Sequence, residues 1–197
     1  MKNHSPLLGL VLMFLLSGNA MAVEEPKYDV LLTEGSFEVR KYAPQLIAET
    51  VVNGDMDEAS NKGFRLIADF IFGNNQAPNV ATSEKIAMTA PVTVEPQTAA
   101  QWRVNFVMPS RYTLETIPKP KNNAVSLKEI PPKTFVVLKY SGFNSESKVQ
   151  TKTQEAKEWA LQKNFKIIGT PQLSRYDPPW TLPMFRRNEI MVEVLSP

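Results

Sequence analysis

After residue 22, this sequence offers only carboxylates, lysines, tyrosines and hydroxyls as side chains that could take part in catalysis. The 197-residue chain contains no cysteine, and its single histidine is His4. A Ser-His-Asp triad, a cysteine nucleophile, a histidine general base and an ordinary zinc site all require imidazole or thiolate. Once the segment that holds His4 is cleaved, these chemistries are excluded, and binding is favoured over catalysis.

The first 22 residues have the pattern of a secretory signal peptide. Lys2 supplies a short basic region, residues 7–16 form an apolar run, and Ala20-Met21-Ala22 is an A-x-A cleavage site. The apolar run is too short to span a bilayer comfortably. We therefore expect a signal peptide at 1–22, cleavage after Ala22, one mature domain over 23–197 and a periplasmic or secreted location. The alternative is a single N-terminal anchor helix.

The charge balance gives no electrostatic reason to expect nucleic acid or a membrane surface as a partner. The formal net charge is +2, and Lys2 carries the only charge in residues 1–22, which leaves +1 on residues 23–197. The absence of cysteine also removes disulfides and a lipoprotein anchor. We expect a soluble exported protein with no stable membrane insertion after cleavage.

Short apolar runs separated by prolines predict strands, and two longer periodic segments predict helices. Residues 28–52 read as extended segments, and Asp55 is placed to cap a helix that ends near Phe72. The further expected elements are strands at 85–94 and 102–108, a loop at 109–123, strands at 125–130 and 134–141, a helix at 145–164, and strands at 165–176 and 189–194.

These elements form two similar halves, each with the order strands, helix, strands. Two such halves can close one sheet into a barrel. We therefore predict an α+β fold, a distorted antiparallel β-barrel of two pseudo-repeats with two helices packed on the outside.

The first helix has more apolar surface than docking on a sheet requires. At about 100° per residue, one continuous stripe contains Met56, Ala59, Gly63, Leu66, Ile67, Phe70 and Ile71. Phe64, Ala68 and Phe72 lie outside it, at i, i+4 and i+8, and we call these three residues the outer ridge. Either the loop after Gly73 covers the ridge, or the ridge is a surface for a flat apolar ligand or a protein partner.

Two segments carry a more specific signal. One is SEKIAMTAPV at residues 83–92, and the other is SRYDPPWTLPMFRRNEI at residues 174–190. Together they resemble the two signatures of the SOUL family of haem-binding proteins, and the resemblance spans roughly residues 27–195. It implies a distorted β-barrel of two pseudo-repeats. On physical grounds we expect structural roles for both segments, including a rigid turn at Asp177 and an ion pair from Arg186 and Arg187 to Glu189.

The family resemblance implies haem or another tetrapyrrole as cofactor, laid as a plate against the first helix. The apolar positions of the family then fall on Phe64 and Ala68, and its basic positions fall on Asn61 and Asp69. Lys62 and Arg65 lie nearby and could face the propionates instead. The candidate cofactor-binding residues are Asn61, Phe64, Arg65, Ala68, Asp69 and Phe72. Without histidine, an axial ligand would be Met, Tyr or Lys, or would be absent.

Three functions remain open at this point. The first is an exported, non-catalytic binding protein for haem or a similar flat hydrophobic ligand. The second is a protein-interaction or stress module of the same fold that binds no haem. The third is an enzyme that uses carboxylates such as Glu49, Glu84 or Glu189 on a small hydrophobic substrate, by resemblance to effector-binding domains with pocket glutamates. No catalytic or metal-binding constellation stands out in the sequence.

Overall fold

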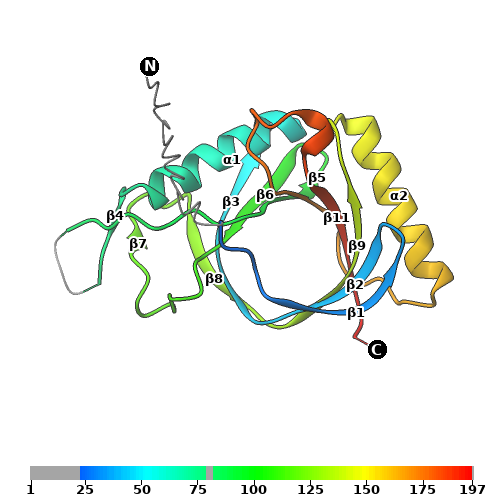
Figure 1. Ribbon diagram of the computed structural model, residues 1–197. Helices are drawn as coiled ribbons and strands as arrows, with labels where there is room; N and C mark the ends of the chain where they lie inside the picture. Colours follow the sequence, from blue (N-terminus) through cyan, green and yellow to red (C-terminus); the bar gives the residue numbers. More distant parts are fainter. Residues whose placement is uncertain (1–22, 79–81, 197) are drawn as a thin grey trace, which may run out of the picture.

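A curled antiparallel sheet of nine strands, with two helices on its outer side, makes up the fold in a computed structural model (Figure 1). The structure describes residues 23–78 and 82–196. The elements are β1 Tyr28–Glu34, β2 Phe37–Tyr42, β3 Gln45–Asn53, α1 Met56–Ile71, β4 Asn75–Gln76, β5 Val92–Thr98, β6 Gln101–Val107, β7 Lys119–Pro120, β8 Ser126–Ile130, β9 Lys133–Tyr140, α2 Glu146–Gln162, β10 Gln172–Arg175, the 3₁₀ helix η1 Pro183–Phe185 and β11 Asn188–Val194. The predicted α+β class and distorted barrel are confirmed.

The order of the strands shows the two predicted repeats. It is β1-β2-β9-β11-β10-β5-β6-β3-β8. When β1 is left out, this order is symmetric about its middle. Each strand of the first half has a counterpart of the second half at the same distance from the other end: β2 matches β8, β3 matches β9, β5 matches β10 and β6 matches β11. β2 of the first half pairs with β9 of the second half, and β8 of the second half pairs with β3 of the first half. The repeats are therefore interlocked rather than side by side.

Alternation along the strands gives the sheet one apolar and one polar face. On β6, Trp102, Val104 and Phe106 face α1, while Arg103 and Asn105 line the concave side. α1 contacts β3, β5 and β6, and α2 contacts β9 and β11. The outer side of the sheet is thus covered by helices, and the concave side carries the polar groups.

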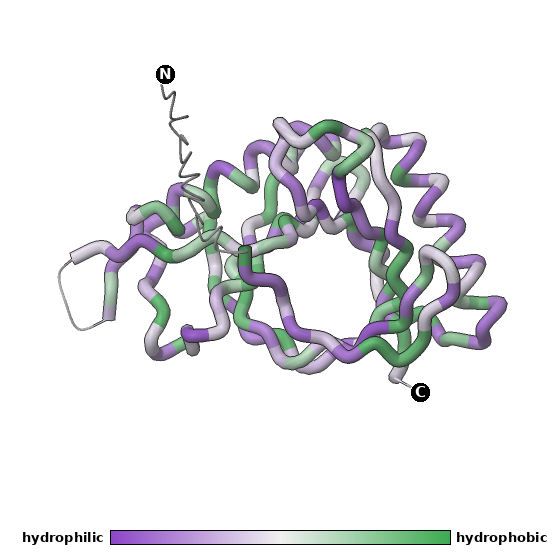
Figure 2. The backbone as a smooth tube through the Cα atoms, viewed as in Figure 1, coloured by the Kyte–Doolittle hydropathy of each residue, from purple (hydrophilic) through white to green (hydrophobic). Residues whose placement is uncertain are grey.

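Both helices begin close to their predicted positions, α1 after the predicted cap Asp55 and α2 after Ser145, which also caps its helix. Asp55 accepts a hydrogen bond from the backbone N–H of Glu58 at 2.8 Å, and Ser145 accepts one from Lys148 at 3.4 Å. The predicted docking stripe of α1 is confirmed, because Ile67, Phe70 and Ile71 are fully buried. α2 is polar along most of its length (Figure 2) and buries Ala156, Trp159 and Ala160.

Two predicted strands were too long, and one predicted loop contains a strand. The strand expected at 85–94 begins only at Val92. The side chain of Asn75 forms hydrogen bonds with both the backbone N–H and the backbone C=O of Glu84, and so holds the segment before Val92 near the end of α1. The strand expected at 165–176 is reduced to β10, with a single isolated bridge at Ile167. The loop expected at 109–123 contains β7, which pairs with β4.

The predicted signal peptide at residues 1–22 lies outside the described residues. Within the part of the chain that the structure describes, no helix has both the length and the apolar character needed to cross a bilayer.

Candidate functional site

A fully buried arginine, Arg40 of β2, lies on the concave side of the sheet. Arg40 donates to both carboxylate oxygens of Glu189, at 2.8 and 3.0 Å, and to Glu38 at 2.7 Å. Burial favours the neutral form of Arg40, but the hydrogen bonds and charge of Glu189 outweigh it, so the pKa of Arg40 stays above its ordinary value. Burial also raises the pKa of Tyr42, which accepts a bond from Arg40, to about 12. Lys139 of β9 also bonds Glu38, so the cluster connects β2, β9 and β11.

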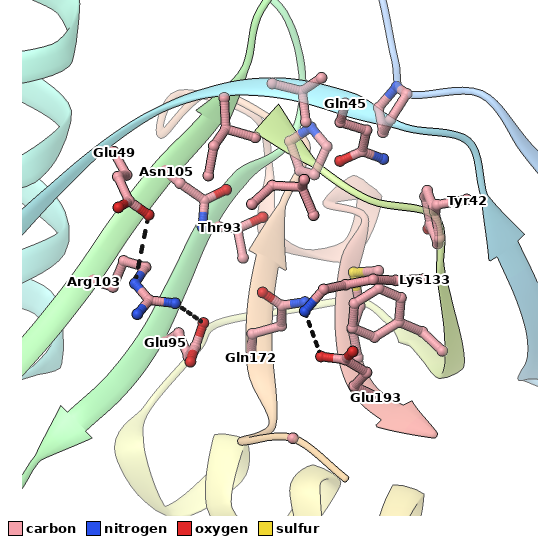
Figure 3. A pocket seen from close by; sticks show the side chains of 18 of the residues that line it. Tyr42, Gln45, Glu49, Thr93, Glu95, Arg103, Asn105, Lys133, Gln172 and Glu193 are labelled. Atoms are coloured by element: carbon pink, nitrogen blue, oxygen red, sulfur yellow. Dashed lines mark hydrogen bonds and ion pairs between the residues drawn. The ribbon is translucent and has the colours of Figure 1, made fainter. Parts of the chain in front are cut away.

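Beside this cluster lies a cavity of about 180 Å³ between the strands (Figure 3). It is lined by residues from both halves of the chain. Three carboxylates, Glu49, Glu95 and Glu193, face two cations, Arg103 and Lys133. The remaining labelled lining residues of Figure 3 are polar or aromatic: Tyr42, Gln45, Thr93, Asn105 and Gln172.

The charges of the cavity are only partly satisfied. Lys133 bonds Glu193 at 2.6 Å, and Arg103 bonds Glu95 at 3.3 Å. The Nε of Arg103 lies 3.6 Å from Oε2 of Glu49, too far for a hydrogen bond. Both of these atoms are buried without a hydrogen-bond partner among the described residues. Since buried polar groups in native proteins are nearly always bonded, this pair is the part of the cavity that calls for an explanation.

The outer ridge of α1 is unevenly exposed. Phe72 is 56% exposed, whereas Ala68 is 8% exposed. Phe64 is half-buried and packs on Phe106 of β6, with the ring centroids 5.7 Å apart. A flat ligand on this helix would therefore have Phe72 as its most accessible contact.

The polar candidates lie on the exposed side of α1. Asn61, Lys62, Arg65 and Asp69 are all exposed. The Nε of Arg65 donates to the carbonyl of Asn61 at 3.3 Å, and Asp69 accepts a hydrogen bond from the side chain of Asn74 at 2.6 Å. The Asp69 carboxylate is thus held by Asn74, just after the end of α1, and the side chains of Lys62 and Arg65 face solvent.

The signature at 174–190 makes the contacts expected of a structural segment. Asp177 accepts a hydrogen bond from the backbone N–H of Arg187 at 2.6 Å, and Arg187 pairs with Glu189 at 2.9 Å. Arg186 instead donates to the carbonyls of Thr181 and Pro179, so the predicted ion pair is formed by Arg187 alone. Trp180 in the same segment is 82% exposed.

The three carboxylates proposed for an enzyme are found in three different environments. Glu49 lines the cavity, Glu189 is buried on Arg40, and Glu84 is bonded to Tyr112 and Arg111 at the surface. Sequence reasoning thus named one cavity residue, Glu49. It missed Glu95, Arg103, Lys133 and Glu193, because only strand register brings them together.

Comparison with known proteins gives one family and a set of similar folds. A family model described as "SOUL heme-binding protein" matches residues 23–193. A search of curated protein sequences found no match.

Solved structures share the fold at low sequence identity. The C-terminal domain of EcmrR aligns with a TM-score of 0.62 at 11% identity, covering 86% of this chain and 99% of that one. A protein described as a hydrolase from Listeria innocua aligns with a TM-score of 0.55 at 13% identity, covering 83% and 94%. An uncharacterized conserved protein from Listeria innocua aligns with a TM-score of 0.54 at 12% identity, covering 88% and 94%. At these identities the likeness concerns the fold alone.

Proposed function

Because the chain belongs to the SOUL heme-binding protein family, we propose that it binds haem or another tetrapyrrole, without catalysis, on the outer ridge of α1. The observation that carries this proposal is the family match over residues 23–193, nearly all of the expected mature chain. Phe72, the exposed residue of the outer ridge, supports the location.

The chemistry of α1 suits an apolar plate with two acidic substituents. Phe72 offers an exposed ring, and Lys62 and Arg65 are cations on the same helix that can reach propionates. The cavity inside the sheet is a poor alternative, since its volume of about 180 Å³ is below the roughly 300 Å³ at which pockets for drug-sized ligands begin. A tetrapyrrole therefore belongs on the outside of the barrel.

The protein would hold the ring rather than the iron. No histidine or cysteine occurs after residue 22, so neither imidazole nor thiolate can ligate haem iron there. When bound, haem would supply its iron and its conjugated ring, while the chain supplies apolar contact and charge pairing. Metal-free protoporphyrin IX should then bind about as well as haemin.

We also propose export with cleavage after Ala22. The Ala20-Met21-Ala22 motif supports this, and the family match begins at the next residue, Val23. N-terminal sequencing of the protein from a periplasmic or culture fraction tests it. A membrane-bound chain that still begins at Met1 would contradict it and favour an anchor helix.

The binding proposal is tested by titrating the purified mature protein with haemin and, separately, with protoporphyrin IX. We expect a saturable change in the Soret band of haemin and a saturable quenching of tryptophan fluorescence by both ligands. Binding of haemin alone would show that iron ligation matters. Binding of neither would contradict the proposal and favour a module that binds protein.

A further inference from the structure

We propose that the cavity on the concave side of the sheet is a second binding site, for a small organic cation with a primary ammonium group. This site is separate from the tetrapyrrole face, because its lining comes from the strands and their connecting loops and none of it from α1. The proposal rests on the charge, the unsatisfied atoms and the size of the cavity.

The charge of the cavity is negative by one. Its carboxylates are Glu49, Glu95 and Glu193, and its cations are Arg103 and Lys133. The Lys133–Glu193 pair is closed by a 2.6 Å contact. Glu49 and Glu95 are left to share the one guanidinium of Arg103, which lies closer to Glu95. The excess negative charge is therefore located at Glu49.

Hydrogen bonding gives the same location. Oε2 of Glu49 is buried and receives no hydrogen bond from the described residues. The side-chain amides of Asn105 and Gln45 line the same cavity and can present their oxygens to a donor. An ammonium group has three donors and no acceptor, and so can satisfy several such oxygens at once. A bond between two charged groups is also stronger than one between neutral groups.

The size and the remaining walls limit the rest of the ligand. The volume of about 180 Å³ equals the room that roughly six water molecules occupy in the liquid. Ile47, Val107, Phe135 and Met191 supply apolar surface inside the cavity. A ligand with one ammonium head and a compact hydrocarbon body satisfies both conditions, and cyclohexylammonium is a suitable probe.

The experiment compares three probes of one shape by isothermal titration calorimetry on the mature protein. These are cyclohexylammonium, the neutral cyclohexanol and the anionic cyclohexanecarboxylate. We expect the ammonium to bind about tenfold to hundredfold more tightly than the alcohol, the range that one charged hydrogen bond provides. The carboxylate should bind more weakly still. No binding of the ammonium, or equal binding of all three probes, would overturn the proposal.

Variants locate the site. Glu49→Gln should remove the preference for ammonium over alcohol, while Glu129→Gln, an exposed glutamate on β8 outside the cavity, should leave it unchanged. Gln45→Glu adds a carboxylate to the cavity and should tighten ammonium binding. This variant still tests the proposal if Glu49→Gln does not fold. Ammonium binding that neither cavity variant alters would place the probe elsewhere. Porphyrin affinity should not change in any of the three, so this proposal and the proposed function can fail independently.

Discussion

Arg40 and Glu189, 149 residues apart in the sequence, form a two-pronged ion pair in which both side chains are completely shielded from solvent. Arg40 is on β2 and Glu189 on β11, and β9 lies between these strands in the sheet. Tyr176 adds a third bond to Glu189, at 2.9 Å. A buried charge without its partner is costly, so this pair ties the first strands of the chain to the last.

Arg40→Met should strongly destabilise the fold. The change leaves the buried Glu189 with fewer partners and Glu38 without its bond to Arg40, and we expect a loss of about 3–5 kcal/mol in the free energy of unfolding. Denaturant unfolding at neutral pH measures it. The double variant Arg40→Met/Glu189→Gln should lose less than the sum of the single changes, since the pair is coupled. Strict additivity would contradict the coupling.

Arg187→Ala should cost less than Arg40→Met. Arg187 bonds Glu189 and Glu25, both at 2.9 Å, and its guanidinium lies 3.6 Å from the ring centre of Tyr176. Because the side chain is 34% exposed and Glu189 keeps Arg40, the expected loss is about 1–3 kcal/mol. Thermal melts measure the stability, and porphyrin affinity of the folded protein should stay the same. Unchanged stability with abolished binding would identify Arg187 as a ligand contact.

Glu38 should make stability depend on acid pH. Burial alone would raise its pKa, but the bonds from Lys139 and Arg40 outweigh burial and lower it below the ordinary 4.5. A carboxylate with a lowered pKa stabilises the fold above its unfolded-state pKa, and this contribution is lost as the pH falls through the folded-state pKa. The stability difference between the wild type and Glu38→Gln should thus be full at pH 7 and shrink below pH 4.5. Urea unfolding across this range measures it, and a constant difference would contradict it.

Gly63→Ala should destabilise the protein although alanine is the better helix former. A Cβ at position 63 would lie 2.5 Å from the side chain of Val104, where α1 packs on β6. Overpacking of this kind costs about 1–3 kcal/mol, more than the roughly 1 kcal/mol gained in helix propensity. Unfolding of Gly63→Ala in the wild-type and Val104→Ala backgrounds measures it. The penalty should vanish or reverse in the second background, and a penalty of equal size in both would contradict the contact.

Local patterns predicted the helices and the order of the elements. Asp55 and Ser145 fix the helix starts through bonds to residues three positions later. The path of residues 85–91 depends on Asn75, which bonds Glu84 across nine positions, and an alternating sequence does not contain that information. The cavity could not be predicted for the same reason, since Glu49 and Arg103 become neighbours only through the register of β3 on β6.

The outer ridge was predicted as one apolar surface, and the structure divides it. Phe64 and Ala68 are largely covered, while Phe72 remains exposed. Periodicity assigns a side of the helix but does not show how far the neighbouring segments extend over it. Phe72 is consequently the sharpest place to test ligand binding, since its replacement removes little packing.

The most direct test of the proposed tetrapyrrole face is the protoporphyrin affinity of Phe72→Asp, measured by fluorescence quenching. Leu161→Asp is the matched control, because Leu161 is a similarly exposed apolar residue at the end of α2, 61% exposed against 56% for Phe72. Both variants should melt close to the wild type. We predict that Phe72→Asp weakens porphyrin binding about tenfold or more, as expected when a charge replaces an apolar contact, and that Leu161→Asp leaves it unchanged. A folded Phe72→Asp protein with wild-type affinity would contradict a ligand site on α1.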